Sequence, residues 1–241
     1  MWVYIYADLP RYTPTENTLF YLKNDWDIID YSDYGHTVNW AWTADYTTLG
    51  TWIKVLHLNW SNWVYSNYFT ESIGKTTFTM HIWFKWISSP SSEYGMGWWM
   101  WRAGSSTTTD RWWAKRQASA NSANLYIIYW ANNTNWQLNQ NYYITYSTSA
   151  FQLYTVTVSW STVTLYKNGS QVASWNWSYP MVGWSNTGTC LYLWIWWYWD
   201  WSAISNGTPW YWWETILEDK VWTQAEITAY YNLIKGNYWL S

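Results

Sequence analysis

The segment Tyr154–Ser174 constrains the fold more than any other, because its residues predict three antiparallel strands joined by tight turns. Valine and threonine alternate at its start, which places Val156 and Val158 on one face of a strand and the threonines on the other. Further on, Asn168-Gly169 is a strong two-residue hairpin signal, because both central residues of a type I′ turn need positive φ. We therefore expect a half-buried antiparallel meander here.

Most of the remaining chain shows similar short strand-forming runs, bounded by Ser, Asn, Gly and Thr. One segment near the C-terminus is instead typical of a helix. Thr223 and Glu226 have the spacing of a capping box, in which each side chain bonds to the other residue's backbone N–H. Apolar residues then recur at helical spacing from Ile227 to Ile234, and Gly236 is placed to supply a left-handed stop. Many strands followed by one helix predict an all-β sandwich with a short C-terminal helix.

Charge and cysteine content exclude several classes of protein. Charged residues make up 11% of the chain and the net charge is −3, which argues against a nucleic-acid-binding surface and a polybasic membrane surface. The lone cysteine, Cys190, excludes an intramolecular disulfide and a cysteine-rich metal site. No run approaches the roughly 18 apolar residues of a membrane span, and the first residues lack the basic region of a signal peptide. We therefore expect no membrane span and no signal peptide within this chain.

Four segments occur in the order and spacing found in one protein superfamily. They are Asp30–His36 (DYSDYGH), Thr77–Lys85 (TFTMHIWFK), Val163–Ser170 (VTLYKNGS) and Ile216–Tyr231 (ILEDKVWTQAEITAYY). Together they resemble the concanavalin A-like lectin/glucanase superfamily, in its laminin-G-like branch. The resemblance implies a two-sheet antiparallel jelly-roll sandwich over residues 15–241, with residues 1–14 as an N-terminal extension or first edge strand. It also implies that Trp83 and Trp222 occupy aromatic positions of the family.

Tryptophan is unusually abundant, at 30 of 241 residues, and many of these residues stand where a turn favours glycine. Seven follow Asn or Asp, namely Trp26, Trp40, Trp60, Trp63, Trp136, Trp177 and Trp201. By resemblance to the family, Trp60, Trp194 and Trp239 also stand at glycine positions. Tryptophan suits such turns poorly, because positive φ is costly for a bulky side chain. One hypothesis is that UGA codons meaning glycine are here translated as tryptophan; the alternative is a natural tryptophan-rich surface protein.

The residues offer little support for catalysis, although the superfamily includes glycoside hydrolases. Retaining enzymes of that kind need two carboxylates about 5–5.5 Å apart, which alternating acidic residues on one strand supply. The nearest acidic group is Glu214, Glu218 and Asp219, and it lacks that pattern. We interpret this group as part of a structural strand and expect that the protein is not an enzyme.

Calcium is the one cofactor that the residues suggest. Many sandwiches of this superfamily bind calcium through loop oxygens, and Asp25, Asp27 and Asp30 are weak candidate ligands because carboxylates suit a hard cation. The competing interpretation, which we prefer, is a polar turn in which Asp30 caps its own backbone.

Composition favours carbohydrate recognition, because sugar rings lie on aromatic side chains while amides and hydroxyls bind their edges. Trp99, Trp101 and Trp113 are the candidate carbohydrate-binding residues, and strand alternation places Trp99 and Trp101 on one face. We expect a non-catalytic recognition module for a glycan or surface polymer, within a longer extracellular or cell-surface protein. A structural or adhesion spacer that binds protein, or nothing, is the alternative, and a degenerate glycoside hydrolase is a third.

Overall fold

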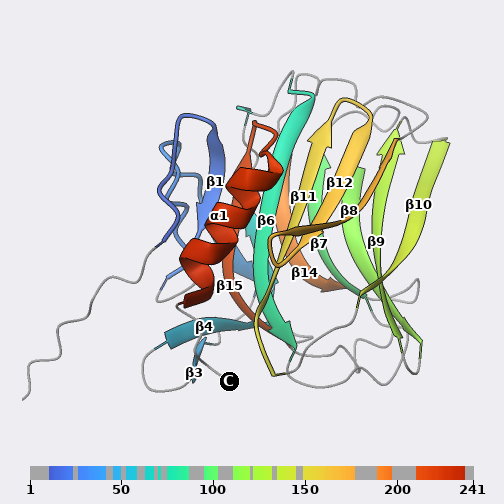
Figure 1. The fold of residues 1–241 in the computed structure, drawn as a ribbon. Helices are drawn as coiled ribbons and strands as arrows, with labels where there is room; N and C mark the ends of the chain where they lie inside the picture. Colours follow the sequence, from blue (N-terminus) through green and yellow to red (C-terminus); the bar gives the residue numbers. More distant parts are fainter. Residues whose placement is uncertain are drawn as a thin grey trace, which may run out of the picture.

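The computed structural model describes residues 11–23, 27–41, 46–49, 53–58, 63–67, 70–71, 75–86, 95–102, 111–119, 122–131, 135–144, 149–176, 189–196 and 210–236. Between residues 95 and 144, and from 189 to 196, it describes the backbone alone. These residues form two antiparallel sheets and one helix, which confirms an all-β fold with a short C-terminal helix (Figure 1). Across the same residues, no helix has the length and apolarity needed to span a bilayer.

The first sheet has eight strands and contains the predicted meander. Its order is β13 (Ser170–Asn176), β12 (Thr162–Lys167), β11 (Gln152–Ser159), β6 (Thr77–Trp86), β15 (Trp210–Glu218), β4 (Ile53–Leu58) and β3 (Tyr46–Leu49), and β1 (Thr18–Leu22) also pairs with β15. The second sheet has seven strands, in the order β10 (Asn135–Ile144), β9 (Ser122–Ala131), β8 (Arg111–Ser119), β7 (Gly95–Arg102), β14 (Thr189–Trp196), β5 (Trp63–Ser66) and β2 (Val38–Ala41). Figure 1 shows the second sheet behind the first, on the side away from helix α1 (Gln224–Lys235).

The hairpin between β12 and β13 forms as its residues predict. Asn168 and Gly169 have φ values of 51° and 79°, the positive angles of a type I′ turn. Val156 and Val158 are fully buried on one face of β11, but Thr155 on the other face is fully buried as well. The prediction of a half-buried strand is therefore wrong, because a second layer covers the threonine face.

That second layer is built around α1. The predicted capping box is present, because the Thr223 hydroxyl accepts from the Glu226 N–H and the Glu226 carboxylate accepts from the Thr223 N–H. The buried stripe of the helix consists of Ile227, Tyr230 and Ile234. The prediction of a left-handed stop at Gly236 is wrong, because this residue keeps a right-handed φ of −64° and continues the helical conformation.

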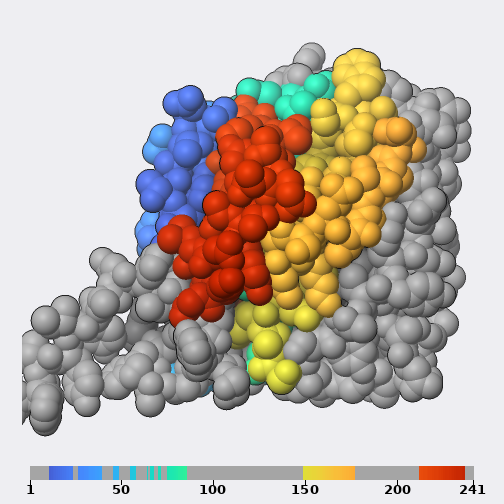
Figure 2. Space-filling view, viewed as in Figure 1, coloured from blue at the N-terminus to red at the C-terminus, as the bar shows by residue number. Residues whose placement is uncertain are grey.

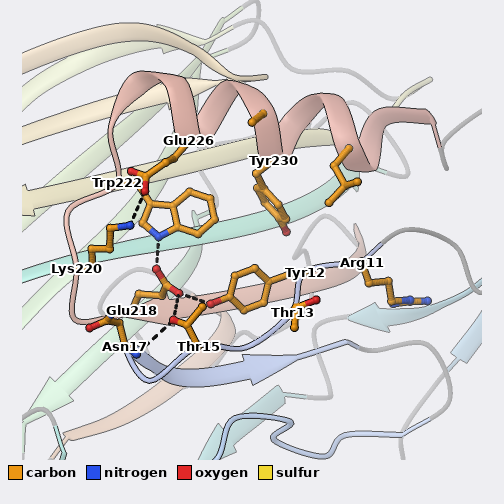
Figure 3. A pocket seen from close by; sticks show the side chains of 12 residues that line it. Arg11, Tyr12, Thr13, Thr15, Asn17, Glu218, Lys220, Trp222, Glu226 and Tyr230 are labelled. Carbon is orange, nitrogen blue, oxygen red and sulfur yellow. Dashed lines mark hydrogen bonds and ion pairs between the residues drawn. The ribbon is translucent and has the colours of Figure 1, made fainter.

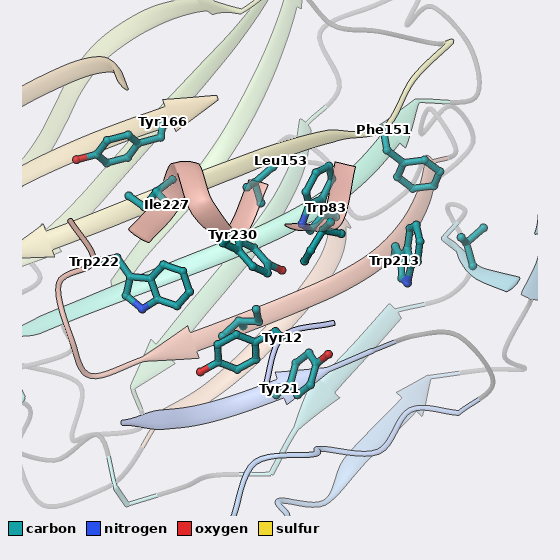
Figure 4. Packing of buried hydrophobic residues seen from close by; sticks show 13 residues of the cluster. Tyr12, Tyr21, Trp83, Phe151, Leu153, Tyr166, Trp213, Trp222, Ile227 and Tyr230 are labelled. Atoms are coloured by element: carbon teal, nitrogen blue, oxygen red, sulfur yellow. The ribbon is translucent and has the colours of Figure 1, made fainter. Parts of the chain in front are cut away.

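We name the apolar layer between α1 and the eight-stranded sheet the outer core. It contains Tyr12, Tyr21, Val55, Trp83, Phe151, Leu153, Tyr166, Trp213, Ile216, Trp222, Ile227, Tyr230 and Ile234 (Figure 4). Tyr12 lies edge-on to Tyr21 with ring centroids 5.1 Å apart, and the His81 ring lies 4.3 Å from that of Trp222. In Figure 2, α1 (red) lies between the described residues near the N-terminus (blue) and the meander (yellow and orange). Trp83 and Trp222 are both buried in this layer.

Some of the tryptophans predicted to occupy glycine positions lie within strands, and the others lie outside the described residues. Trp40, Trp63 and Trp136 lie within β2, β5 and β10, where an extended backbone suits any residue, so the turn interpretation is wrong for them. Trp194 lies within β14, in keeping with the family strand to which the resemblance assigns it. Trp26, Trp60, Trp177, Trp201 and Trp239 lie outside the described residues. A different tryptophan, Trp160, occupies the turn between β11 and β12 with a φ of 56° and is 55% exposed.

Replacing Trp160 with glycine is expected to stabilise the protein. A left-handed φ costs a residue with a side chain about 1–2 kcal/mol, whereas glycine adopts it freely. Chemical denaturation should give Trp160→Gly a free energy of unfolding about 1 kcal/mol higher than that of the parent chain. Trp160→Ala is the control, because it removes the exposed ring but keeps the Cβ atom. An equal gain from both variants would show that the ring, and not the backbone angle, is unfavourable.

Candidate functional site

A groove of about 540 Å³ opens beside α1, at the end of β15 (Figure 3). One wall comes from residues 11–17 of the N-terminal segment. The other wall comes from one stripe of α1, namely Glu226, Ala229, Tyr230 and Leu233, whose spacing places them on one helix face. The floor comes from the end of β15 and the turn that follows it, through Glu218, Lys220 and Trp222. We name this cavity the helix groove.

Glu218 is the polar centre of the floor and is only 2% exposed. Its carboxylate accepts hydrogen bonds from the Tyr12 hydroxyl and the Trp222 indole N–H, and from the hydroxyls of Thr15 at 3.3 Å and Thr18 at 3.2 Å. Figure 3 shows Tyr12 and Thr15 reaching it from the N-terminal segment and Trp222 reaching it from the turn before α1. Burial, with the added effect of the bond to Glu218, raises the pKa of Tyr12. Four donors satisfy this carboxylate, so it has a structural role in the groove.

An ion pair between two lining residues, Lys220 and Glu226, lies beside the helix groove (Figure 3). Lys220 donates to Glu226, whose other oxygen accepts from the Thr223 N–H at 2.7 Å. The hydrogen bond from Lys220, followed by that from Thr223, lowers the pKa of Glu226. The hydrogen bond to Glu226 likewise raises the pKa of Lys220, so the pair favours the charged form of both groups.

A second carboxylate, Glu214, lies beneath the outer core and is 1% exposed. Burial raises its pKa to about 6, although hydrogen bonding by Tyr21 and Tyr230 and the positive charges of Arg11 and Lys23 oppose the rise. This group therefore titrates closer to neutrality than an ordinary glutamate.

The acidic group of β15 lacks the geometry of a glycosidase. Glu214 and Glu218 are four residues apart on one strand, which separates them by about 13 Å at the rise of a β-strand. Glycosidases place their carboxylates about 5–5.5 Å apart or about 6.5–9.5 Å apart. Asp219, the third acid, pairs with Lys75 instead. These observations favour the structural interpretation of the acidic group.

The predicted polar turn forms around Asp30, which is 3% exposed. Its Oδ1 accepts from the backbone N–H groups of Tyr21 and Ser32, each at 2.9 Å. Its Oδ2 accepts from the Ser32 hydroxyl at 2.8 Å and from the His36 N–H at 2.9 Å, and meets the His36 ring at 2.6 Å. Burial acts to raise the pKa of Asp30, but these hydrogen bonds outweigh it and lower the pKa.

Of the other two calcium candidates, the structure describes only Asp27. Asp27 accepts from the Tyr31 hydroxyl at 2.9 Å, and Asp25 lies outside the described residues. Within the described part of the chain, no group of three or more His, Cys, Asp or Glu side chains is placed to hold a metal ion. The engaged oxygens of Asp30 favour the polar-turn interpretation, and calcium binding stays a prediction.

The three candidate carbohydrate residues meet in the seven-stranded sheet. Trp99 of β7 is the Cα partner of Trp113 in β8, and Trp101 is two residues further along β7, opposite Arg111. On the other side of β7, Trp99 is opposite Tyr192 of β14. The structure thus brings together positions that are separated in the chain, in adjacent strands of one sheet.

Sequence reasoning did not find the helix groove. The closing segment of the family resemblance contains Trp222, but Tyr12 lies in the stretch assigned to an N-terminal extension. Tyr12 is in fact 8% exposed and belongs to the outer core. No local pattern marks a tyrosine whose partner is 206 residues away, so only the folded chain reveals the groove.

No family model and no curated protein matches this chain. Several solved structures nevertheless share its fold. The binding domain of botulinum neurotoxin serotype D matches with a TM-score of 0.65 and 14% identity, over 90% of this chain and 51% of that chain.

Two further structures match over a similar share of this chain. One is described by the statement that cell entry of botulinum neurotoxin type C is dependent upon interaction with two ganglioside molecules. It matches with a TM-score of 0.65 and 16% identity, over 90% of this chain and 51% of that chain. The other is the binding domain of botulinum neurotoxin DC in complex with SialylT, with a TM-score of 0.63 and 12% identity, over 91% of this chain and 52% of that chain. This chain spans about half the length of these structures, and identities this low show a shared fold alone.

The His36 ring contributes pH-dependent stability. It lies between Asp30 at 2.6 Å and Glu71 at 3.1 Å, with 9% of its side chain exposed. Burial acts to lower the pKa of His36, but hydrogen bonds to the two carboxylates outweigh it and raise the pKa above its ordinary 6.5. A raised pKa stabilises the fold below 6.5, and this stabilisation is lost as the pH rises through the raised value.

Urea denaturation from about pH 6 to about pH 9 tests this contribution. The free energy of unfolding should fall over this range in the parent chain, and the fall should be smaller in His36→Gln, which cannot titrate. In Glu71→Gln the fall in the free energy of unfolding should be intermediate, because His36 keeps its bond to Asp30 in that variant. Identical pH profiles for the parent chain and His36→Gln would contradict the assignment.

Proposed function

We propose that this chain is a non-catalytic recognition module that binds a glycan or a surface polymer. The observation that carries the proposal is the register of the seven-stranded sheet, which sets Trp99 opposite Trp113 and Trp101 two residues along the same strand. On this proposal the three indoles form an aromatic platform for the apolar faces of sugar rings. Neighbouring Asn, Ser and Thr residues, abundant in the chain, supply the groups that bind hydroxyls.

The structural neighbours support this proposal. They are binding domains of toxins, and two are described by their interaction with gangliosides or by a complex with SialylT. Another is described as a complex with rat synaptotagmin II, so a protein partner is the competing form of recognition. The saturated carboxylate of Glu218 and the long separation of Glu214 from Glu218 favour binding over hydrolysis.

The same proposal includes a jelly-roll topology for the two sheets. Two antiparallel sheets with a C-terminal helix fit a laminin-G-like jelly roll of the concanavalin A-like superfamily over residues 15–241. Coverage of about half of each neighbour fits a module within a longer extracellular or cell-surface protein. Residues 11–14 pack beside this domain through Tyr12, so their removal would also remove part of the outer core.

Glycan-array binding by the full chain tests the proposed function. Trp99→Ala, Trp101→Ala and Trp113→Ala should each weaken binding to the best glycan by about tenfold, equivalent to about 1.4 kcal/mol. Trp160→Ala is the matched control, because Trp160 is an exposed tryptophan in a turn of the eight-stranded sheet, away from β7 and β8. Binding that all three variants retain would exclude the platform, and a chain that binds no glycan but captures a protein receptor would favour the adhesion alternative.

We also propose that Trp160 stands where the natural protein has glycine, through a UGA codon that its source reads as glycine. The left-handed φ of 56° at this exposed turn supports the substitution. A tandem mass spectrum of the natural protein across Ser159–Ser161 should show glycine at position 160. Tryptophan in that spectrum would contradict recoding at position 160.

A further inference from the structure

We propose that the helix groove is a second ligand site, distinct from the tryptophan platform, and that it takes an uncharged sugar unit of about one or two rings. The choice of sugar as the ligand class rests on the proposed function. The groove itself rests on contacts that do not involve the seven-stranded sheet.

The helix groove has the size and the rigidity of a preformed site. Its volume of about 540 Å³ lies within the range of about 300–1,000 Å³ that is typical of small-molecule pockets. Its walls belong to segments far apart in the chain, and Glu218 bonds directly to Tyr12, Thr15 and Trp222 across the floor. A ligand would therefore meet walls that are already positioned, which lowers the entropic cost of binding.

The charges of the groove favour an uncharged ligand. Two positive groups, Arg11 and Lys220, and two negative groups, Glu218 and Glu226, line it. Glu218 accepts from four donors, and Lys220 and Glu226 bond to each other. Arg11 lies over the Trp213 ring, 5.6 Å from its centroid. Neither sign of charge predominates, so a strongly anionic or cationic ligand gains no net attraction here.

The two walls differ in chemistry in a way that matches a sugar ring. Ala229 and Leu233 of α1 are exposed, and Leu233 keeps 46% of its surface in solvent. The facing wall carries hydroxyl and amide groups, with Thr13 exposed and Asn17 half-buried. A pyranose has an apolar face and a hydroxyl-bearing edge, so its apolar face fits the helix and its hydroxyls fit the N-terminal wall. An extended apolar peptide would leave the polar wall unmatched.

Modest affinity is expected for this site. The rings of Tyr12, Trp222 and Tyr230 pack on one another, with centroids 5.6 to 6.2 Å apart, and each residue is less than a tenth exposed. They offer edges rather than open faces to a ligand, so a full stacking platform is absent from these three residues. A dissociation constant of roughly 1 mM for a free disaccharide follows from such limited contact.

NMR titration of the full chain tests the groove. The probes are cellobiose, lactose and chitobiose as neutral sugars, glucuronic acid as an anionic sugar, and N-acetyl-leucine amide as an apolar peptide mimic. We expect at least one neutral disaccharide to shift the methyl signals of Ala229 and Leu233, with no saturable shift from the other two probe classes. Ala229→Trp, which fills the groove, should weaken this binding by about tenfold or more.

Ala225→Trp is the matched control, because Ala225 is exposed on the same helix but does not line the groove. The proposal is overturned if no neutral sugar shifts the two methyl groups, if glucuronic acid or the leucine amide binds better, or if Ala225→Trp weakens binding as much as Ala229→Trp. The two proposals can be tested independently. Trp99→Ala and Trp113→Ala should leave sugar binding in the helix groove unchanged, and Ala229→Trp should leave glycan-array binding by the tryptophan platform unchanged.

Discussion

The buried carboxylate of Glu218 is the interaction on which the outer half of the structure depends. It joins the end of β15 to Tyr12, Thr15 and Thr18 on one side and to Trp222 on the other. A buried charge is tolerable only when donors satisfy it, and removing one donor leaves a desolvated charge without compensation. Glu218 therefore ties both the N-terminal segment and the entry into α1 to the sheet, beside the pairing of β1 with β15 and the bond of the Trp222 N–H to Thr79.

The central strands β6, β11 and β15 of the eight-stranded sheet are buried on both faces. Valines of β11 pack on the inner side, and threonines with His81 lie beneath α1 and Trp222 on the outer side. His81 is fully buried, and burial lowers its pKa to about 3, so the neutral ring packs against Trp222 and shares a hydrogen bond of 2.8 Å with the Thr155 hydroxyl. His81 therefore serves the fold, and the two sites proposed for recognition are the helix groove and the tryptophan positions of the other sheet.

Local features of the structure could be predicted from the residues, and long-range ones could not. The Asn168-Gly169 turn and the Thr223–Glu226 capping box depend on residues within four positions of each other, and both form as predicted. The burial of Thr155 was missed because its cover comes from a distant helix. Trp160 was missed because it follows serine rather than Asn or Asp, so the dipeptide rule did not select it. The candidate aromatics were found by composition and alternation, but their adjacency is a property of strand register.

The most direct test of the Glu218 centre is the free energy of unfolding of Tyr12→Phe, measured by urea denaturation with Tyr34→Phe as the matched control. Tyr12 is 8% exposed and donates to Glu218, whereas Tyr34 is 46% exposed. A hydrogen bond to a charged group is worth about 1.5–3 kcal/mol, so Tyr12→Phe should lose about 2 kcal/mol and Tyr34→Phe less than about 0.5 kcal/mol. Equal stability of the two variants would contradict the view that Glu218 ties the N-terminal segment and α1 to the sheet.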